Sequence, residues 1–193
     1  MITSDSEMRE LLAERSITKV LQAYCQGVDR RAWEQIRDCY HPGAVDSHGA
    51  YVGDADGLIE WLRKRHEYVL SSTHLLTNVS VKFSDDYRFA RVESYCLSLQ
   101  LVDPSSGDPF AGTGDEPVFT NVMSRYVDTF ENRQSGGWRI LRRDCVFDWM
   151  RRRNTRDFVE IDPAWVSARR DPGDLLFAPL PPLDADPVEP AVS

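Results

Sequence analysis

The sequence lacks the short motifs that mark several large enzyme classes. It contains no nucleophile elbow, no P-loop, no glycine-rich dinucleotide fingerprint and no HExxH zinc motif. Gly112-Thr113-Gly114 precedes acidic residues rather than a helix pattern, so it does not fit a phosphate-binding loop. These absences argue against nucleotide-dependent and zinc-dependent chemistry, and we expect no cofactor and no metal.

Cysteines are few and scattered. The four cysteines, Cys25, Cys39, Cys96 and Cys145, form no CxxC pair and no Cys/His cluster with zinc spacing. They fit small, reduced core side chains of a cytoplasmic protein. The N-terminus is too polar for a signal peptide, and no apolar run approaches the roughly 18 residues that span a membrane. We therefore expect a cytoplasmic protein with no membrane partner.

Basic residues are outnumbered by acidic ones. The 193 residues include 23 Lys and Arg against 31 Asp and Glu, which gives a formal net charge of -8. Nucleic-acid binding needs clustered cations that contact phosphates, so no nucleic-acid partner is expected. The basic group Arg151–Arg153 with Arg156 has acidic neighbours and is expected to be a solvated patch with ion pairs.

The first 70 residues carry a helical hydrophobic period. Apolar side chains recur at three- and four-residue steps, which is typical of helices with one buried stripe. Helices are predicted over Ser6–Val28, Ala32–Tyr40 and Asp54–Leu70. His41-Pro42-Gly43 is expected to end the second helix, Ala44–Ser47 fits a short strand, and Gly49–Gly53 fits a turn-rich link.

The period then changes to the alternation of strands. Strands are predicted over Thr73–Phe83, Phe89–Val102, Val118–Glu131 and Trp138–Trp149. Asp85-Asp86 and Ser135-Gly136-Gly137 fit hairpin turns, and Asp103–Pro117 fits a longer loop.

The order of these elements predicts one folded domain over residues 1–150. Residues 151–193 form a C-terminal extension, and the five prolines of Pro179–Pro190 favour an extended or disordered end. Helices followed by antiparallel strands indicate the α+β class, with the N-terminal helices packed on a curved, mainly antiparallel sheet. Such a sheet makes a cone-shaped α+β barrel, whose interior is an apolar pocket for a small hydrophobic substrate.

Asp29 and His74 are the leading catalytic candidates. Asp29 lies where the first helix ends, and a carboxylate opposes the helix dipole there, which favours a cationic or histidine partner. His74 opens a strand-like run. A histidine oriented by a carboxylate makes a general base near neutral pH. The alternative for His74 is a core histidine that bonds a backbone carbonyl.

Tyr24 and His48 are further candidates. Tyr24 lies on the apolar stripe of the first helix, and its hydroxyl can reach the pocket to stabilise an oxyanion or protonate a leaving group. His48 is predicted to be a pocket wall or a secondary proton relay. His41, Asp46 and His48 superficially resemble a metal cluster, but alternating strand residues point to opposite faces, so a turn is favoured over a metal site.

Four more residues are predicted to contact the substrate. Arg125 can neutralise an enolate or carboxylate, with a cross-strand ion pair as the alternative. Glu93 lies within a strand and would need a partner if it faced inward, for which His74 is a candidate. Trp33 and Trp61 fit core positions that also line an aromatic pocket wall.

Several sequence blocks occur in a recognisable order over roughly residues 7–150, about three quarters of the chain. They are Ala13-Glu14-Arg15-Ser16-Ile17, Tyr24, Val28-Asp29-Arg30-Arg31-Ala32-Trp33, Tyr40-His41-Pro42-Gly43-Ala44-Val45-Asp46-Ser47-His48-Gly49, Thr73-His74, Arg125-Tyr126-Val127-Asp128-Thr129-Phe130, Gly137-Trp138-Arg139-Ile140, Arg142-Arg143 and Asp148-Trp149. Together they resemble the SnoaL-like family of the nuclear-transport-factor-2-like superfamily.

This resemblance implies an Asp-His dyad like that of scytalone dehydratase, bile-acid dehydratase and hexachlorocyclohexane dehydrochlorinase. By it, Asp29 is the orienting carboxylate, His74 is the base, and Tyr24 matches a catalytic tyrosine of the bile-acid enzyme. The implied activity is a cofactor-independent lyase, a dehydratase acting on a hydrophobic cyclic or polycyclic ketone of steroid-like or polyketide-like type.

The resemblance also leaves alternatives. An isomerase or a cyclase would use the same base, and the fold also hosts non-catalytic members such as the small subunits of ring-hydroxylating dioxygenases. A homodimer or homotrimer is implied, with the outer face of the sheet as the interface. The long Asp103–Pro117 loop and the C-terminal extension depart from the family pattern.

Overall fold

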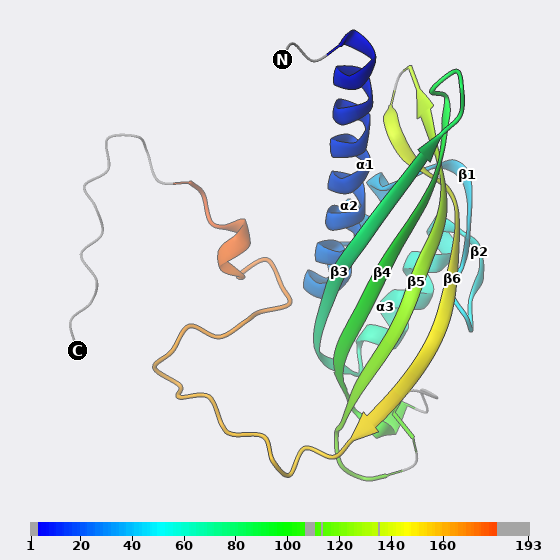
Figure 1. Cartoon of the computed structure of the whole chain (residues 1–193). Helices are drawn as coiled ribbons and strands as arrows, with labels where there is room; N and C mark the ends of the chain where they lie inside the picture. The colour runs from blue at the N-terminus through cyan, green and yellow to red at the C-terminus, as the bar shows by residue number, and fades with distance from the viewer. Residues whose placement is uncertain (1–3, 107–110, 113, 135, 181–193) are drawn as a thin grey trace.

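The computed structural model describes residues 4–106, 111–112, 114–134 and 136–180 of the chain. The helices are α1 (Asp5–Arg30), α2 (Trp33–Asp38) and α3 (Ala55–His66). The strands are β1 (Tyr40–Ser47), β2 (Val52–Asp54), β3 (Val69–Phe83), β4 (Phe89–Val102), β5 (Val118–Arg133) and β6 (Gly137–Arg153). Two short 3-10 helices, η1 (Pro104–Ser106) and η2 (Leu175–Phe177), lie outside this framework (Figure 1).

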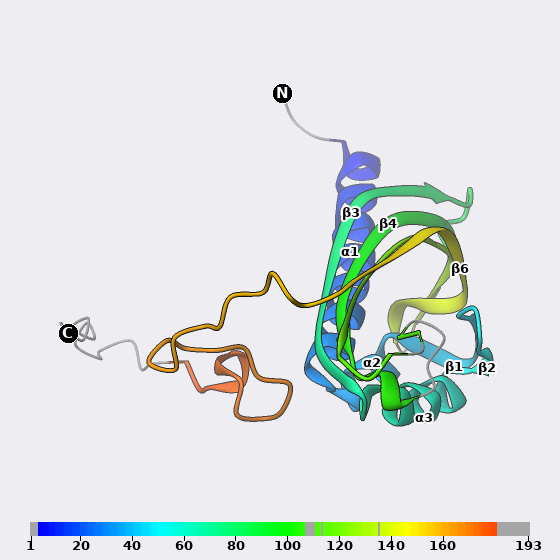
Figure 2. The same cartoon turned by 90° about the horizontal axis from the view of Figure 1, so that it is seen from below.

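The strands form one curved sheet with the order β2-β1-β6-β5-β4-β3. β1 runs parallel to β6, and the other neighbouring strands are antiparallel. Figure 2 shows the sheet curving around the three helices, with β3 and β2 at its two unpaired edges. This arrangement confirms the α+β class and the curved, mainly antiparallel sheet, although the sheet does not close into a barrel.

Helix α1 sets the position of the first candidate residues. Its N-terminus is a capping box, in which Ser4 and Glu7 satisfy each other's backbone N–H groups. One stripe of α1, which includes Ile17, Leu21 and Tyr24, is buried against the sheet. The helix ends at Arg30, and the left-handed backbone of the next residue, Arg31 (φ 55°), turns the chain away. Asp29 therefore lies in the last helical turn.

Gly27 allows α1 and α2 to approach each other closely. A Cβ built at Gly27 would lie 2.8 Å from Ile36 Cγ1 and 3.3 Å from the Ala32 carbonyl oxygen. We expect Gly27→Ala to lower the free energy of unfolding by about 1–3 kcal/mol, because overpacking outweighs the better helix propensity of alanine. Urea denaturation measures the change. Gly114→Ala is the control, since its Cβ meets nothing within 4 Å; an equal effect at both sites would contradict the steric account.

Several predicted boundaries were wrong where the helices meet the first strands. The second helix ends at Asp38, and Tyr40 to Gly43 belong to β1, where Tyr40 pairs with Ile140 of β6. Pro42 and Gly43 coincide with an irregularity in that pairing rather than with a helix end. The third helix stops at His66, because Val69 is fully buried and pairs with Val102 as β3 begins.

The later strands agree with prediction within a few residues. β3 begins before Thr73, so His74 lies inside the strand rather than at its start. β2 was missed, since Val52–Asp54 had been predicted as part of a turn and of the following helix. The predicted Asp103–Pro117 loop begins with η1, and residues 107–110 and 113 of it lie outside the described residues, as does residue 135 of the predicted Ser135-Gly136-Gly137 turn.

The C-terminal extension leaves the sheet after Arg153, the last residue of β6. An extended segment then leads to η2, and residues 181–193, which hold most of Pro179–Pro190, lie outside the described residues. None of the helices in the described part of the chain is long and apolar enough to cross a membrane.

Candidate active site

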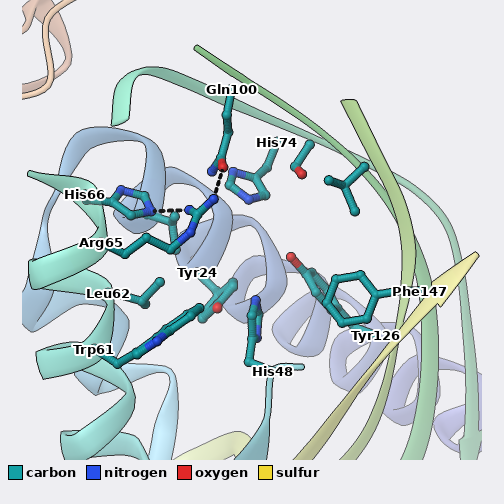
Figure 3. Close-up of a pocket in the computed structure, with 13 residues that line it drawn as sticks. Tyr24, His48, Trp61, Leu62, Arg65, His66, His74, Gln100, Tyr126 and Phe147 are labelled. Atoms are coloured by element: carbon teal, nitrogen blue, oxygen red, sulfur yellow. Dashed lines mark hydrogen bonds between the residues drawn. The ribbon is translucent and has the colours of Figure 1, made fainter. Parts of the chain in front are cut away.

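A cavity opens inside the curve of the sheet (Figure 3). The cavity itself holds about 50 Å³, and the space that opens from it to solvent brings the total to about 510 Å³. Apolar walls come from Val28, Trp61, Leu62, Val122 and Phe147. The polar side chains that line it are Tyr24, His48, Arg65, His66, His74, Ser98, Gln100 and Tyr126. A pocket that combines apolar walls with convergent polar side chains is a candidate small-molecule site.

Asp29 and His74 meet at one side of this cavity. The last turn of α1 brings the Asp29 carboxylate against β3, where His74 Nδ1 lies 2.6 Å from Asp29 Oδ1. The His74 backbone N–H donates to Asp29 Oδ2 at 2.8 Å, and the Ser72 hydroxyl donates to Oδ1 at 2.8 Å. Ser72 and His74 share a face because alternate strand residues point the same way. Three donors thus hold one nearly buried carboxylate.

The electrostatics of the pair favour an oriented, basic imidazole. Burial raises the pKa of Asp29. The hydrogen bonds from His74 and Ser72 and the attraction of His74 lower it by more than burial raises it, so the pKa of Asp29 falls below its usual value. Burial lowers the pKa of His74, and the bond and charge of Asp29 raise it above 6.5. Because a carboxylate only accepts, Nδ1 carries the proton and Nε2 of the neutral ring is free to accept another.

Tyr24 projects into the same cavity from α1. Figure 3 shows its hydroxyl directed toward the space between Trp61 and His48. Its ring packs edge-on against Tyr40 and Tyr126, with centroids 6.0 and 5.9 Å away. Burial raises the pKa of Tyr24 well above 10, so the phenol stays protonated and can donate a hydrogen bond.

His48 and Trp61 also line the cavity, and His41 lies away from it. His48 follows β1, and its Nδ1 lies 3.3 Å from Asp46 Oδ1. His41 Nε2 instead lies 2.9 Å from the backbone oxygen of Glu131. Among the residues that the structure describes, no three His, Cys, Asp or Glu side chains gather in a metal-binding group.

Arg125, Glu93 and Trp33 lie away from the cavity, which corrects their predicted contact with substrate. Arg125 lies on β5 and Glu93 on β4, and both side chains are on the outer face of the sheet. Tyr126, which lines the cavity, is on the inner face. Their side chains pair with each other at 2.6 Å, so Glu93 is not the partner of His74. Trp33 packs edge-on against His66, with ring centroids 6.0 Å apart.

Several residues in and around the site were not predicted from the sequence. Ser72 could have been predicted, because it lies two positions before His74 and residues two apart on a strand share a face. Arg65 and Gln100 come from α3 and β4 and are joined by a 2.8 Å hydrogen bond (Figure 3). His66 is fully buried, and burial together with Arg170 lowers its pKa well below 6.5, so it remains neutral.

Arg170 connects the C-terminal extension to the rear of the dyad. Its guanidinium donates to the backbone oxygens of Asp29, Val28 and Val69, and Nη2 lies 2.6 Å from His66 Nδ1. Burial and Arg31 lower the pKa of Arg170 to about 10, which leaves it charged at neutral pH. A cation at these carbonyls complements the C-terminal end of the α1 dipole.

The SnoaL-like domain model matches residues 9–144, which is more than half of the chain. The chain belongs to the SnoaL-like family. This confirms the resemblance predicted from its sequence blocks. None of the curated protein sequences matches this SnoaL-like chain.

Solved structures share the fold at low identity. A scytalone dehydratase-like protein of Novosphingobium aromaticivorans DSM 12444 is 18% identical, with 78% of this chain and 97% of that chain covered and a TM-score of 0.61. The hexachlorocyclohexane dehydrochlorinase LinA-type3 of Novosphingobium barchaimii LL02 is 14% identical, with coverages of 81% and 99% and a TM-score of 0.64. A nuclear transport factor 2-like superfamily protein of Salmonella enterica is 11% identical, with coverages of 72% and 92% and a TM-score of 0.59.

Proposed function

We propose that this SnoaL-like protein is a cofactor-independent lyase, a dehydratase that acts on a hydrophobic cyclic or polycyclic hydroxy-ketone. The observation that carries the proposal is the 2.6 Å contact between His74 Nδ1 and Asp29 Oδ1 at the wall of an open cavity. A histidine oriented by a carboxylate beside a cavity is the arrangement that a general base requires.

The chemistry begins with proton abstraction. His74 Nε2 removes the acidic proton next to the substrate carbonyl, and the ionised Asp29 stabilises the imidazolium that forms. Negative charge moves to the carbonyl oxygen, where the protonated Tyr24 hydroxyl donates a hydrogen bond. The hydroxyl on the next carbon then leaves as water. An isomerase or a cyclase would share the first step and differ in the fate of the enolate.

The cavity and the relatives both support this choice. Trp61, Leu62 and Phe147 offer apolar surface to the rings of a substrate at an open pocket. The dehydratase and dehydrochlorinase names of two structural relatives both denote eliminations, so the proposed reaction is of the same type.

A panel of cyclic β-hydroxy ketones with one, two and four rings tests the proposal. We expect enone formation, followed by its ultraviolet absorbance, with the fastest turnover for the ring system that best fills the cavity. Absence of turnover across the panel, together with co-purification of a large oxygenase subunit, would instead indicate the non-catalytic alternative.

Asp29→Asn is expected to lower kcat by about 10²–10⁴-fold, because the amide accepts fewer of the three hydrogen bonds and no longer stabilises the imidazolium. Activity requires neutral His74, so kcat/KM rises with pH through the His74 pKa, which lies above 6.5 in the wild type. Without the Asp29 charge, burial is the main influence on His74, so the His74 pKa is lower in the variant. The acidic limb of the pH profile should therefore move to lower pH; a limb that stays in place would contradict the assignment.

A further inference from the structure

A second carboxylate–histidine pair borders the same cavity. Asp46 lies in β1, and its Oδ1 is 3.3 Å from Nδ1 of His48, two residues later in the chain. The Asp46 side chain is fully buried, and that of His48 is 17% exposed. This pair resembles Asp29 and His74 in its order of contacts: a buried carboxylate behind, a histidine in front, and open space beyond the ring.

The Asp46 carboxylate is held from both sides. Its Oδ2 accepts a hydrogen bond of 2.6 Å from the Tyr40 hydroxyl. Burial raises the pKa of Asp46, but the hydrogen bonds from His48 and Tyr40 and the charge of Arg143 lower it below its usual value. Asp46 is therefore ionised, and a buried charge is costly unless its partners are fixed. It accepts the Nδ1–H of His48, so Nε2 is the ring nitrogen left for the cavity, and the ring donates a proton there when both nitrogens carry one.

The two histidines occupy different walls. Figure 3 shows His74 and His48 on opposite sides of the central space, with the Tyr24 and Tyr126 side chains to either side of His48. The His48 ring packs 6.1 Å from Trp61 and 6.2 Å from Tyr126, measured between centroids, so aromatic neighbours fix its tilt. Both histidines therefore border the space that a substrate would occupy.

We propose that His48 is the catalytic acid that protonates the departing hydroxyl, with Asp46 and Tyr40 as positioning residues. This rests on the proposed function. His74 takes the proton from carbon, and the carbon–oxygen bond breaks with its electron pair on oxygen. That oxygen takes the Nε2 proton of the His48 imidazolium and leaves as water. The enolate pair becomes the new carbon–carbon double bond, and afterwards His74 gives up a proton to solvent while His48 regains one.

A pair of probes with different leaving groups isolates this step. 3-Hydroxycyclohexanone must expel a hydroxyl, which needs a proton. 3-(4-Nitrophenoxy)cyclohexanone expels a stabilised phenolate, which does not. We expect His48→Gln to lower kcat for the hydroxy probe by about 10²–10⁴-fold, the usual contribution of an acid or base, and to change kcat for the nitrophenoxy probe by less than about fivefold.

Matched variants separate the outcomes. His74→Gln should slow both probes, and His41→Gln, a buried histidine away from the cavity, should slow neither. Asp46→Asn should slow the hydroxy probe selectively but less than His48→Gln does. Equal losses on both probes in His48→Gln, or no loss on the hydroxy probe, would overturn the role of His48. Failure of the wild type on both probes would instead count against the proposed function itself and, with it, against this inference.

Discussion

Replacing His74 by Gln is expected to lower the rate of dehydration by about 10²–10⁴-fold, which is the usual contribution of a positioned base. Gln has a similar size and can still donate to Asp29, so the local packing is preserved while the proton acceptor is lost. Steady-state kinetics on the best cyclic β-hydroxy ketone measures the effect. The loss should appear in kcat rather than in KM, because the imidazole acts on the reacting proton and contributes little to binding.

The control for this variant is His41→Gln. His41 is also buried but contacts only a backbone oxygen of Glu131 among the interactions described for it, away from the cavity. Both variants should keep the far-ultraviolet circular dichroism of the wild type. Unchanged turnover in His74→Gln would show that His74 is not the base. An equal loss of turnover in His41→Gln would show that the loss comes from general destabilisation of the fold.

Asp128→Asn is expected to lower the free energy of unfolding by about 3–5 kcal/mol, the range for removing one partner of a buried ion pair. Asp128 and Arg143 are both fully buried and form two hydrogen bonds of 2.8 and 2.7 Å. The Arg143 guanidinium also lies over the rings of Tyr24 and Tyr126, at 4.3 and 4.1 Å. Asn preserves volume but leaves an uncompensated cation in the core. Urea denaturation at neutral pH measures the change.

The neighbouring residues offer a matched surface pair. Arg142 and Asp144 form the same two-bond geometry at 2.8 and 2.7 Å, but their side chains are 53% and 35% exposed. Solvent screens such a pair, so Asp144→Asn should shift the denaturation midpoint only slightly. If both variants had equal effects, burial would not be the reason for the stability of the inner pair. A weakened Asp128–Arg143 pair should also disturb the cavity, because Arg143 supports two of its tyrosines.

The sequence was informative wherever one periodicity dominated. The stripe of α1 and the alternation of β3 to β6 predicted these elements and the curved sheet, and the order of blocks predicted the family. The separation of Asp29 and His74 became meaningful because one ends the helix and the other lies in a strand beside it. Local pattern alone did not define where β1 starts, since its pairing with β6 involves residues 100 positions away, as Tyr40 and Ile140 show.

The misplaced site residues have a specific cause. On β5, the cavity face carries Tyr126 and Asp128, while the outer face carries Val127 and Arg125. The alternation of residues along a strand assigns them to two faces of the sheet. It does not indicate which face is buried when both faces contain polar and apolar residues. The buried Arg143 is what makes an inward Asp128 acceptable, and that pairing lies 15 positions apart across a hairpin. Arg170 was unpredictable for the same reason, since it reaches Asp29 from 141 positions away.

Hydrogen–deuterium exchange at carbon tests the central claim, that Asp29 holds His74 as a base facing the cavity. Cyclohexanone has an acidic proton and no leaving group, so its exchange in D₂O, followed by mass spectrometry, reports proton abstraction alone. The account predicts that the wild type accelerates deuterium uptake well above the uncatalysed rate and that His74→Gln falls to that background rate. Uptake by His74→Gln at the wild-type rate, or no acceleration by a wild type that dehydrates cyclic hydroxy-ketones, would contradict it.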